Sequence, residues 1–207
     1  MKLDTIPKAN QIKIIITFVI VAIIITLIVI FREELFKVKT NITDGERFFT
    51  EYNQVPVDNV FNYATAKEAI ELFNEKQAVI FFGFKDCKWC QSYAPILDEY
   101  AKENKIDTIY YVDIKEDRAN NTEEYQMLVK LLDKYLSKDD EGNKRIYVPN
   151  VYFVKDGKIV GHNNDTSMEE GADTEGYYEE NGEALREKIN KLFSKIKSTC
   201  DDSDKGC

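Results

Sequence analysis

Two cysteines separated by two residues, Cys87 and Cys90, are the residues of this sequence that most directly suggest chemistry. Such a pair suits thiol–disulfide exchange, the binding of a metal ion, or a structural disulfide. The pair lies in the stretch FFGFKDCKWCQSYAP, residues 81–95, after an apolar run that ends in glycine and before a pattern typical of a helix. Which of the three kinds of chemistry applies therefore depends on the secondary structure that positions the two sulfur atoms.

A strand and a helix are expected on either side of the pair. The continuous apolar run of residues 78–82 predicts a strand that is buried on both faces. Apolar residues recur at helical spacing over residues 93–101. Cys87 would then begin a helix, where free amide groups and the helix dipole favour a thiolate and lower the pKa of a cysteine. Cys90, one turn later, could attack a mixed disulfide formed at Cys87, so Cys87 is the predicted nucleophile and Cys90 the resolving thiol.

The other possible metal ligands do not complete a typical zinc site. They are Cys200 and Cys207, with six residues between them, and one histidine, His162, which is expected to be exposed. Zinc sites usually present two close pairs of ligands, so no metal is expected. A purely structural Cys87–Cys90 bridge stays an alternative. Cys200 and Cys207 could close a small disulfide loop, act as a mobile redox relay, or remain as free or intermolecular thiols.

The hydrophobic periodicity predicts the order β-α-β-α-β-α-β-β-α. Thr65 and Glu68 match a capping box, which predicts a helix start. Alternating strands and helices indicate a parallel core, and a terminal hairpin adds antiparallel strands. The predicted fold class is therefore α/β, with a central mixed sheet of about four to five strands flanked by helices. The expected further strands cover 59–64, 107–114, 148–154 and 158–162, the expected further helices cover 66–73, 125–136 and 185–196, and a loop is expected over 163–182.

Three features resemble the thioredoxin superfamily over about residues 58–197. They are the C-x-x-C at a strand–helix junction, Pro95 five residues after the second cysteine, and Val148-Pro149 at the start of the hairpin strand. The resemblance implies a thioredoxin-like fold in which the Val148–Pro149 peptide is cis and lies against the cysteines. Pro149 would shape the substrate groove, the backbone of Val148 would pair with a substrate strand, and Trp89 is a further candidate for substrate binding. Without the resemblance, Pro149 would simply begin a strand.

The sequence departs from this family beside the cysteines. Asp86 stands where the family usually has tryptophan, and Phe81 stands where it has a buried acid that helps to deprotonate the second cysteine. Proton transfer from Cys90 must therefore use another group or water. The Lys88-Trp89 dipeptide leaves the redox potential and the direction of transfer open.

The run Ile14 to Phe31 has eighteen residues and no charge. A bilayer core of roughly 30 Å needs about 20 apolar residues, with a lower limit near 17. We interpret this run as an uncleaved transmembrane helix rather than a cleaved signal. The expected layout is a cytoplasmic tail (1–13), the anchor (14–31), a stalk (32–57), a thioredoxin-like domain (58–198) and a cysteine-bearing tail (199–207).

The net charge and the number of cysteines limit the functions that this sequence could have. The formal net charge of −9 argues against a nucleic-acid partner. Three basic residues precede the apolar run and three follow it closely, so the charge count does not decide on which side of the membrane the domain lies. The four cysteines form two near pairs, which fits an oxidising compartment outside the cytoplasm. The sequence therefore predicts a single-pass membrane protein with an extracytoplasmic thiol–disulfide oxidoreductase domain and no cofactor. Its partners would be thiol- or disulfide-containing exported proteins and a separate redox-recycling partner.

A narrower resemblance concerns the GFKDCKWC phrase, the polar insertion before YVP and the N-terminal apolar run. Together they are similar to bacteriocin-transport accessory proteins and related thioredoxin-like proteins of Gram-positive bacteria. This resemblance leaves a second function open, that of a non-catalytic accessory or docking protein of a peptide exporter.

Overall fold

The computed structural model describes residues 16, 18–26, 28, 42–167 and 174–197. The chain divides into two compact units, Met1–Ile42 and Thr43–Cys207. Residues 16, 18–26 and 28, within the predicted anchor, are helical and exposed. Within the part of the chain that the structure describes, no helix has both the length and the apolar character needed to cross a membrane. The rest of the predicted anchor, the tails 1–13 and 199–207, and residues 32–41 of the predicted stalk lie outside the described residues.

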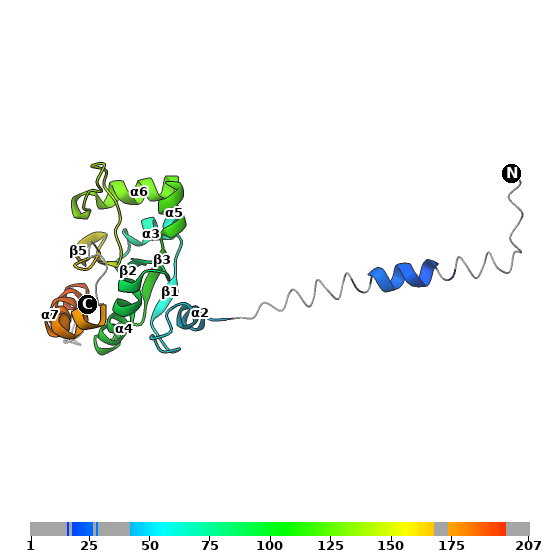
Figure 1. Cartoon of the computed structure of the whole chain (residues 1–207), viewed down its shortest axis with the longest axis horizontal. Helices are drawn as coiled ribbons and strands as arrows, with labels where there is room; N and C mark the ends of the chain where they lie inside the picture. The colour runs from blue at the N-terminus through cyan, green and yellow to red at the C-terminus, as the bar shows by residue number, and fades with distance from the viewer. Residues whose placement is uncertain (1–15, 17, 27, 29–41, 168–173, 198–207) are drawn as a thin grey trace, which may run out of the picture. The chain divides into compact units, whose positions relative to one another are not determined.

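A five-stranded mixed sheet forms the centre of the second unit, in the order β1-β3-β2-β4-β5 (Figure 1). Strands β1 (Phe61–Tyr63), β3 (Ile109–Asp113) and β2 (Gln77–Gly83) are parallel. Strands β4 (Asn150–Lys155) and β5 (Lys158–Asn163) form the antiparallel hairpin. The predicted α/β fold class with a mixed sheet is confirmed, and six of the seven residues of β2 are buried, as its continuous apolar run predicts.

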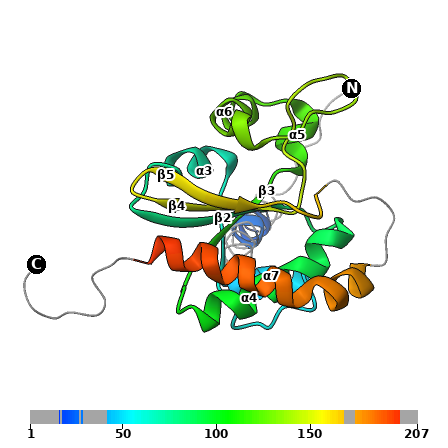
Figure 2. The ribbon, with the colours of Figure 1, turned by 90° about the vertical axis from the view of Figure 1, so that its left-hand side faces the viewer.

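Helices cover both faces of this sheet (Figure 2). One face carries α4 (Lys88–Glu103) and α7 (Thr174–Ile196), and the other carries α3 (Ala66–Leu72), α5 (Lys115–Asn120) and α6 (Glu123–Leu132). A 3-10 turn, Asp133–Tyr135, follows α6. The capping box predicted at the start of α3 is present, because the Thr65 hydroxyl accepts from the Glu68 amide and the Glu68 carboxylate accepts from the Thr65 amide. The short helix α5 was not predicted from the sequence.

Residues 43–57, which the sequence assigned to the stalk, pack into the second unit. They contain helix α2 (Asp44–Glu51), which begins with a capping box of Thr43 and Glu46. The side chains of Phe48 and Tyr52 are fully buried, and the Phe48 ring stacks on that of Phe61, with centroids 4.0 Å apart. Burial of these two large aromatic side chains explains why the compact unit begins at Thr43 and not near residue 58.

Helix α2 also covers the outer edge of the sheet. The backbone amide of Tyr63 in β1 donates to the Asp44 carboxylate at 2.9 Å. The amide of Phe61 donates to the side-chain oxygen of Asn59 at 3.1 Å. These two amides of β1 are therefore satisfied by side chains.

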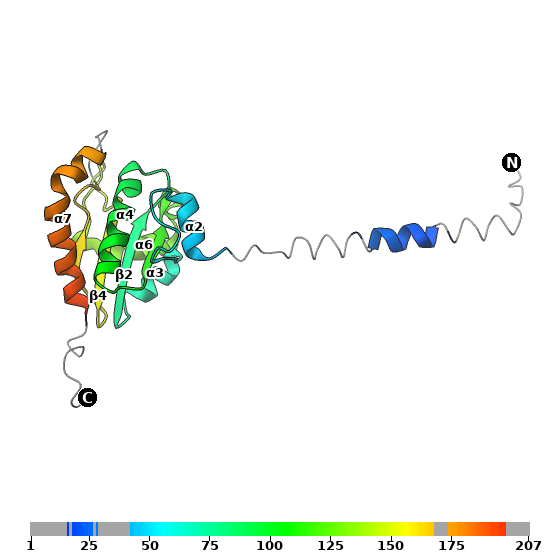
Figure 3. The same cartoon turned by 90° about the horizontal axis from the view of Figure 1, so that it is seen from below.

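Helix α7 begins at Thr174, inside the stretch 163–182 that the sequence assigned to a loop. The Ser92 hydroxyl of α4 donates to the Thr174 hydroxyl at 2.8 Å, and Tyr178 packs against Trp89 with only 8% of its surface exposed. These contacts with α4 explain a helix in an acidic, glycine-bearing segment. Figure 3 shows that α4 lies between α7 and α2.

Candidate functional site

The two predicted active cysteines lie at the junction of β2 and α4. Strand β2 ends at Gly83, and Cys87 is the N-cap residue of α4. Cys87 and Cys90 are joined by a disulfide, with Cα atoms 5.1 Å apart. Cys87 is partly exposed and Cys90 is fully buried. A substrate could therefore reach the sulfur of Cys87 but not that of Cys90.

The start of α4 favours negative charge on the Cys87 sulfur. The Cys90 amide donates to Cys87 Sγ at 3.1 Å, and the first turn of α4 contains no acidic residue. Once the disulfide is reduced, this amide and the helix dipole stabilise a thiolate at Cys87. The Asp86 carboxylate would oppose that charge, but it forms a hydrogen-bonded ion pair with Lys115, which lowers the pKa of Asp86. The nearest acid to Cys87 along the chain is thus neutralised by a partner.

The loop before β4 meets the cysteines as the resemblance implied. The Val148–Pro149 peptide is cis, and both residues are buried. The carbonyl oxygen of Val148 lies 4.0 Å from Cys87 Sγ. The structure therefore brings Cys87, Val148 and Pro149 together, while the substrate-binding roles of Val148 and Pro149 stay predictions.

Trp89, the third predicted substrate-binding residue, lies under α7. Its side chain is 8% exposed, and its ring meets those of Tyr177 and Tyr178 edge-on at centroid distances of 5.2 and 5.8 Å. Little of its surface is left for a substrate in this conformation. Contact between Trp89 and a substrate stays a prediction.

Aromatic rings surround the position where thioredoxins have a buried acid. Phe81 is fully buried and lies opposite Tyr111 in the sheet register, with ring centroids 5.7 Å apart. The Tyr52 hydroxyl donates to the Tyr111 hydroxyl at 3.0 Å. Burial raises the pKa of the Tyr52 and Tyr111 hydroxyls well above the usual value for tyrosine, so both hydroxyls stay protonated and neither can act as a base.

Two positioning residues were not recognised from the sequence. The side-chain amide of Gln91 donates to the carbonyls of Glu51 and Lys85 at 2.8 and 2.7 Å, which ties the turn before Cys87 to the end of α2. Arg118 Nη1 donates to the carbonyl of Ile146 at 3.2 Å. No sequence signal identifies the contacts of Gln91 with Glu51 and of Arg118 with Ile146, because each joins segments that are distant in the chain.

His162 is half-buried, and not exposed as expected. Its ring lies 5.6 Å from that of Tyr152 and 5.0 Å from that of Tyr135, measured between centroids. Burial and the positive charge of Lys188 lower the pKa of His162, whereas Asp165 raises it. Within the described part of the chain, no cluster of three or more histidine, cysteine, aspartate or glutamate residues could hold a metal ion. Cys200 and Cys207 lie outside the described residues.

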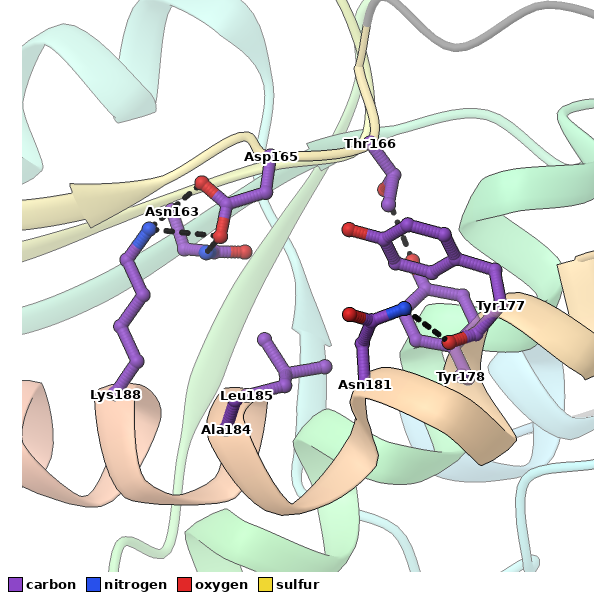
Figure 4. A pocket seen from close by; sticks show the side chains of 9 residues that line it. All are labelled: Asn163, Asp165, Thr166, Tyr177, Tyr178, Asn181, Ala184, Leu185 and Lys188. Atoms are coloured by element: carbon purple, nitrogen blue, oxygen red, sulfur yellow. Dashed lines mark hydrogen bonds and ion pairs between the residues drawn. The ribbon is translucent and has the colours of Figure 1, made fainter.

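A pocket of about 150 Å³ lies between the end of β5 and α7 (Figure 4). Several of its polar groups bind one another. Lys188 pairs with Asp165 at 2.6 Å, and the hydroxyls of Thr166 and Tyr178 are 2.9 Å apart. Its polar side chains are thus largely engaged within the protein. The pocket is lined by Asn163, Asp165, Thr166, Tyr177, Tyr178, Asn181, Ala184, Leu185 and Lys188.

The sheet order, the cis peptide and the C-x-x-C disulfide define a thioredoxin-like α/β domain with a site suited to thiol–disulfide chemistry. No family model and no curated protein matches the chain. Solved structures similar to it include thioredoxin from Trypanosoma brucei brucei (15% identity, 66% of this chain and 91% of that chain covered, TM-score 0.39). They also include thioredoxin O1 from Arabidopsis thaliana in the oxidised state (19%, 60% and 97%, TM-score 0.36) and a mutant thioredoxin from Halobacterium salinarum (16%, 66% and 93%, TM-score 0.37). At such identities and scores the comparisons carry no conclusion about activity.

Proposed function

We propose that the protein is a membrane-anchored, extracytoplasmic thiol–disulfide oxidoreductase that acts on exported proteins or peptides through Cys87 and Cys90. One observation carries the activity: a partly exposed sulfur at a helix N-terminus is bridged to a buried sulfur and faces a cis X-Pro peptide. The charge-free run Ile14 to Phe31 supports the anchor, and the paired cysteines support the oxidising compartment.

The exchange proceeds in two steps. In the reducing direction the Cys87 thiolate attacks a substrate disulfide, the substrate S–S bond breaks, a mixed disulfide forms, and the first substrate thiolate takes up a proton. Cys90 then loses its proton and attacks the Cys87 sulfur, which releases the second substrate thiolate and closes the Cys87–Cys90 bond. Two electrons pass from the protein dithiol to the substrate. Oxidation is the reverse, and the reduction potential of a separate recycling partner sets the direction.

The Cys90 proton must leave a fully buried position that has no neighbouring acid at residue 81. The departing substrate thiolate or water accepts it. Meanwhile the backbone of Val148 binds the extended substrate, because its carbonyl lies beside the attacked sulfur. Pro149 holds that carbonyl in place and, lacking an N–H group, does not compete with the substrate strand for hydrogen bonds.

A trapping experiment tests the proposal. In a Cys90→Ser variant the mixed disulfide cannot be resolved, so substrates should accumulate covalently bound to Cys87 and be identified by mass spectrometry after gel electrophoresis without reductant. A Cys87→Ser variant is the control and should trap nothing. Equal recovery from the two variants would count against exchange through Cys87.

The second candidate function is non-catalytic docking in a peptide export system, in the manner of bacteriocin-transport accessory proteins. The aromatic cluster at Phe81 favours it, because the site lacks the acid that assists Cys90 in thioredoxins. Insulin reduction and refolding of a scrambled disulfide protein separate the two functions. Absence of cysteine-dependent activity in both assays would favour docking.

A further inference from the structure

Two arginines from distant parts of the sequence lie beside the exchange site. Arg118 belongs to α5, and Arg145 belongs to the polar insertion before β4. Arg118 Nη1 donates to the Ile146 carbonyl, and the guanidinium of Arg145 lies 5.6 Å from the Tyr147 ring centroid. Ile146 and Tyr147 lead directly into Val148, whose carbonyl oxygen is 4.0 Å from Cys87 Sγ. Both guanidinium groups therefore flank the segment that faces the reacting sulfur.

Arg118 also reaches the turn on the other side of the site. Its guanidinium carbon lies 5.1 Å from the ring centroid of Phe84, and the Phe84 carbonyl accepts the Cys87 amide at 3.0 Å. Arg118 is thus in contact with both segments that frame Cys87. A ligand that binds Arg118 would lie at the mouth of the site.

Neither arginine has an acidic partner within the described residues: none of the ion pairs found there includes Arg118 or Arg145. Both side chains are partly buried. Burial, and next the positive charge of Arg145, lower the pKa of Arg118. Two like charges held close together and partly out of water are unfavourable unless a negative group joins them.

Three of the four acidic residues in the neighbouring segments are already engaged by other groups, and the fourth, Glu116, is exposed. Asp86 pairs with Lys115, Asp113 accepts the backbone amide of Lys115, and Asp117 accepts the Thr122 hydroxyl at 2.7 Å. Residues 84–88, 113–118 and 144–149 together contain six basic and four acidic residues, while the whole chain has a formal net charge of −9. The rim of the exchange site is therefore locally basic on an acidic protein.

We propose that Arg118 and Arg145 bind an acidic stretch of the substrate polypeptide next to its reacting cysteine, an inference that rests on the proposed function. A substrate backbone held at Val148 carries its neighbouring side chains past the residues that precede Val148. The planar guanidinium groups suit carboxylates, which they bind with two parallel hydrogen bonds. Because the rest of the protein repels acidic chains, this pair selects the orientation in which the cysteine meets Cys87. Such rim charges act mainly on the association rate and its salt dependence.

The test compares two synthetic peptides, each with one cysteine in a mixed disulfide with a small thiol. The peptides are identical except that glutamates or lysines flank the cysteine. Reduced full-length protein in detergent is mixed with each peptide, and the fluorescence of Trp89, the single tryptophan of the sequence, reports closure of the adjacent disulfide. Wild type should react about 10-fold faster with the glutamate peptide at low ionic strength, and added salt should shrink the difference.

Arg145→Glu should reverse the preference, and Arg118→Gln should reduce it. Lys158→Glu makes the same charge change as Arg145→Glu, at the exposed far end of the β4–β5 hairpin, and should keep the wild-type preference. Circular dichroism of each variant checks that it folds.

Equal rates for the two peptides with the wild type would overturn the charge preference and leave the proposed function standing. If Arg145→Glu and Lys158→Glu change the ratio of the two rates equally, the charge preference is likewise overturned and the proposed function stands. A preference that disappears in inorganic phosphate, but not in chloride of equal ionic strength, would identify a phosphate site and overturn the assignment to an acidic peptide. No reaction with either peptide would refute the proposed function itself.

Discussion

Alkylation of Cys87 at graded pH tests whether the start of α4 activates this sulfur. The protein for this experiment carries Cys90→Ser, Cys200→Ser and Cys207→Ser, so that a single thiol reacts with iodoacetamide. The perturbation is Lys88→Glu, which places a carboxylate in a first turn that has no acid. The alkylation rate follows the thiolate fraction and therefore reports the pKa of Cys87.

The magnitude follows from two contacts. A hydrogen bond to a charged group contributes about 1.5–3 kcal/mol, and the helix dipole contributes about 0.3–1 kcal/mol. The lower limits sum to about 1.8 kcal/mol, which is about a 20-fold rise in the ionisation constant, since about 1.36 kcal/mol corresponds to one pKa unit. The pKa of Cys87 should thus fall well below the ordinary thiol value of about 8.5. Lys88→Glu should lower the ionisation constant of Cys87 about 3-fold and so raise its pKa, because a carboxylate in the first turn opposes the helix dipole.

Lys158→Glu is the control, because it changes the charge equally at the far end of the hairpin. If the protein that keeps Lys88 shows an alkylation midpoint at the ordinary thiol pKa, the activation argument is refuted. The argument is also refuted if Lys158→Glu shifts the alkylation midpoint of Cys87 as much as Lys88→Glu does.

Three stability measurements test the elements around the site. Gln91→Ala removes two hydrogen bonds, to the carbonyls of Glu51 and Lys85, and should lower the free energy of unfolding in urea by about 1–3 kcal/mol; a loss of only a few tenths would contradict their role in tying the turn. Phe81→Ala empties a fully buried position and should cost about 3–5 kcal/mol in the same assay, while an unchanged midpoint would mean that the aromatic cluster is loosely packed. The lowered pKa of His162 means that the folded state favours the neutral ring. The contribution of His162 to stability is therefore fully present above about pH 6.5 and is lost as the pH falls through the lowered pKa. His162→Gln should make the free energy of unfolding depend less on pH in this range. An unchanged slope of the free energy of unfolding against pH would contradict this reasoning.

Local signals in the sequence were sufficient for the main elements and the centre of the site. The capping box at Thr65 and Glu68 acts within one helical turn, so the start of α3 was predictable. The apolar run of residues 78–82 and the C-x-x-C that follows predicted the junction at Cys87. The cis peptide at Pro149 came from the family resemblance, since an X-Pro pair alone also suits a strand start.

The remaining features depend on tertiary contacts that no local pattern contains. Phe48 packs on Phe61 across the edge of the sheet, so residues 43–57 looked like a linker. Gly176 and Gly182 weaken the helical signal of α7, whose first turns are held by contacts with α4. Arg118 and Arg145 come from different segments, and only the folded chain brings them to the same loop.

The cap that Asp44 and Asn59 place on β1 affects how the protein behaves at high concentration. An uncovered edge strand is a template on which another chain can add a strand, and this is a common start of aggregation. Here the amides of Phe61 and Tyr63, which such a chain would need, are already occupied by side-chain oxygens. Self-association through this border of the sheet is thereby disfavoured while α2 stays folded.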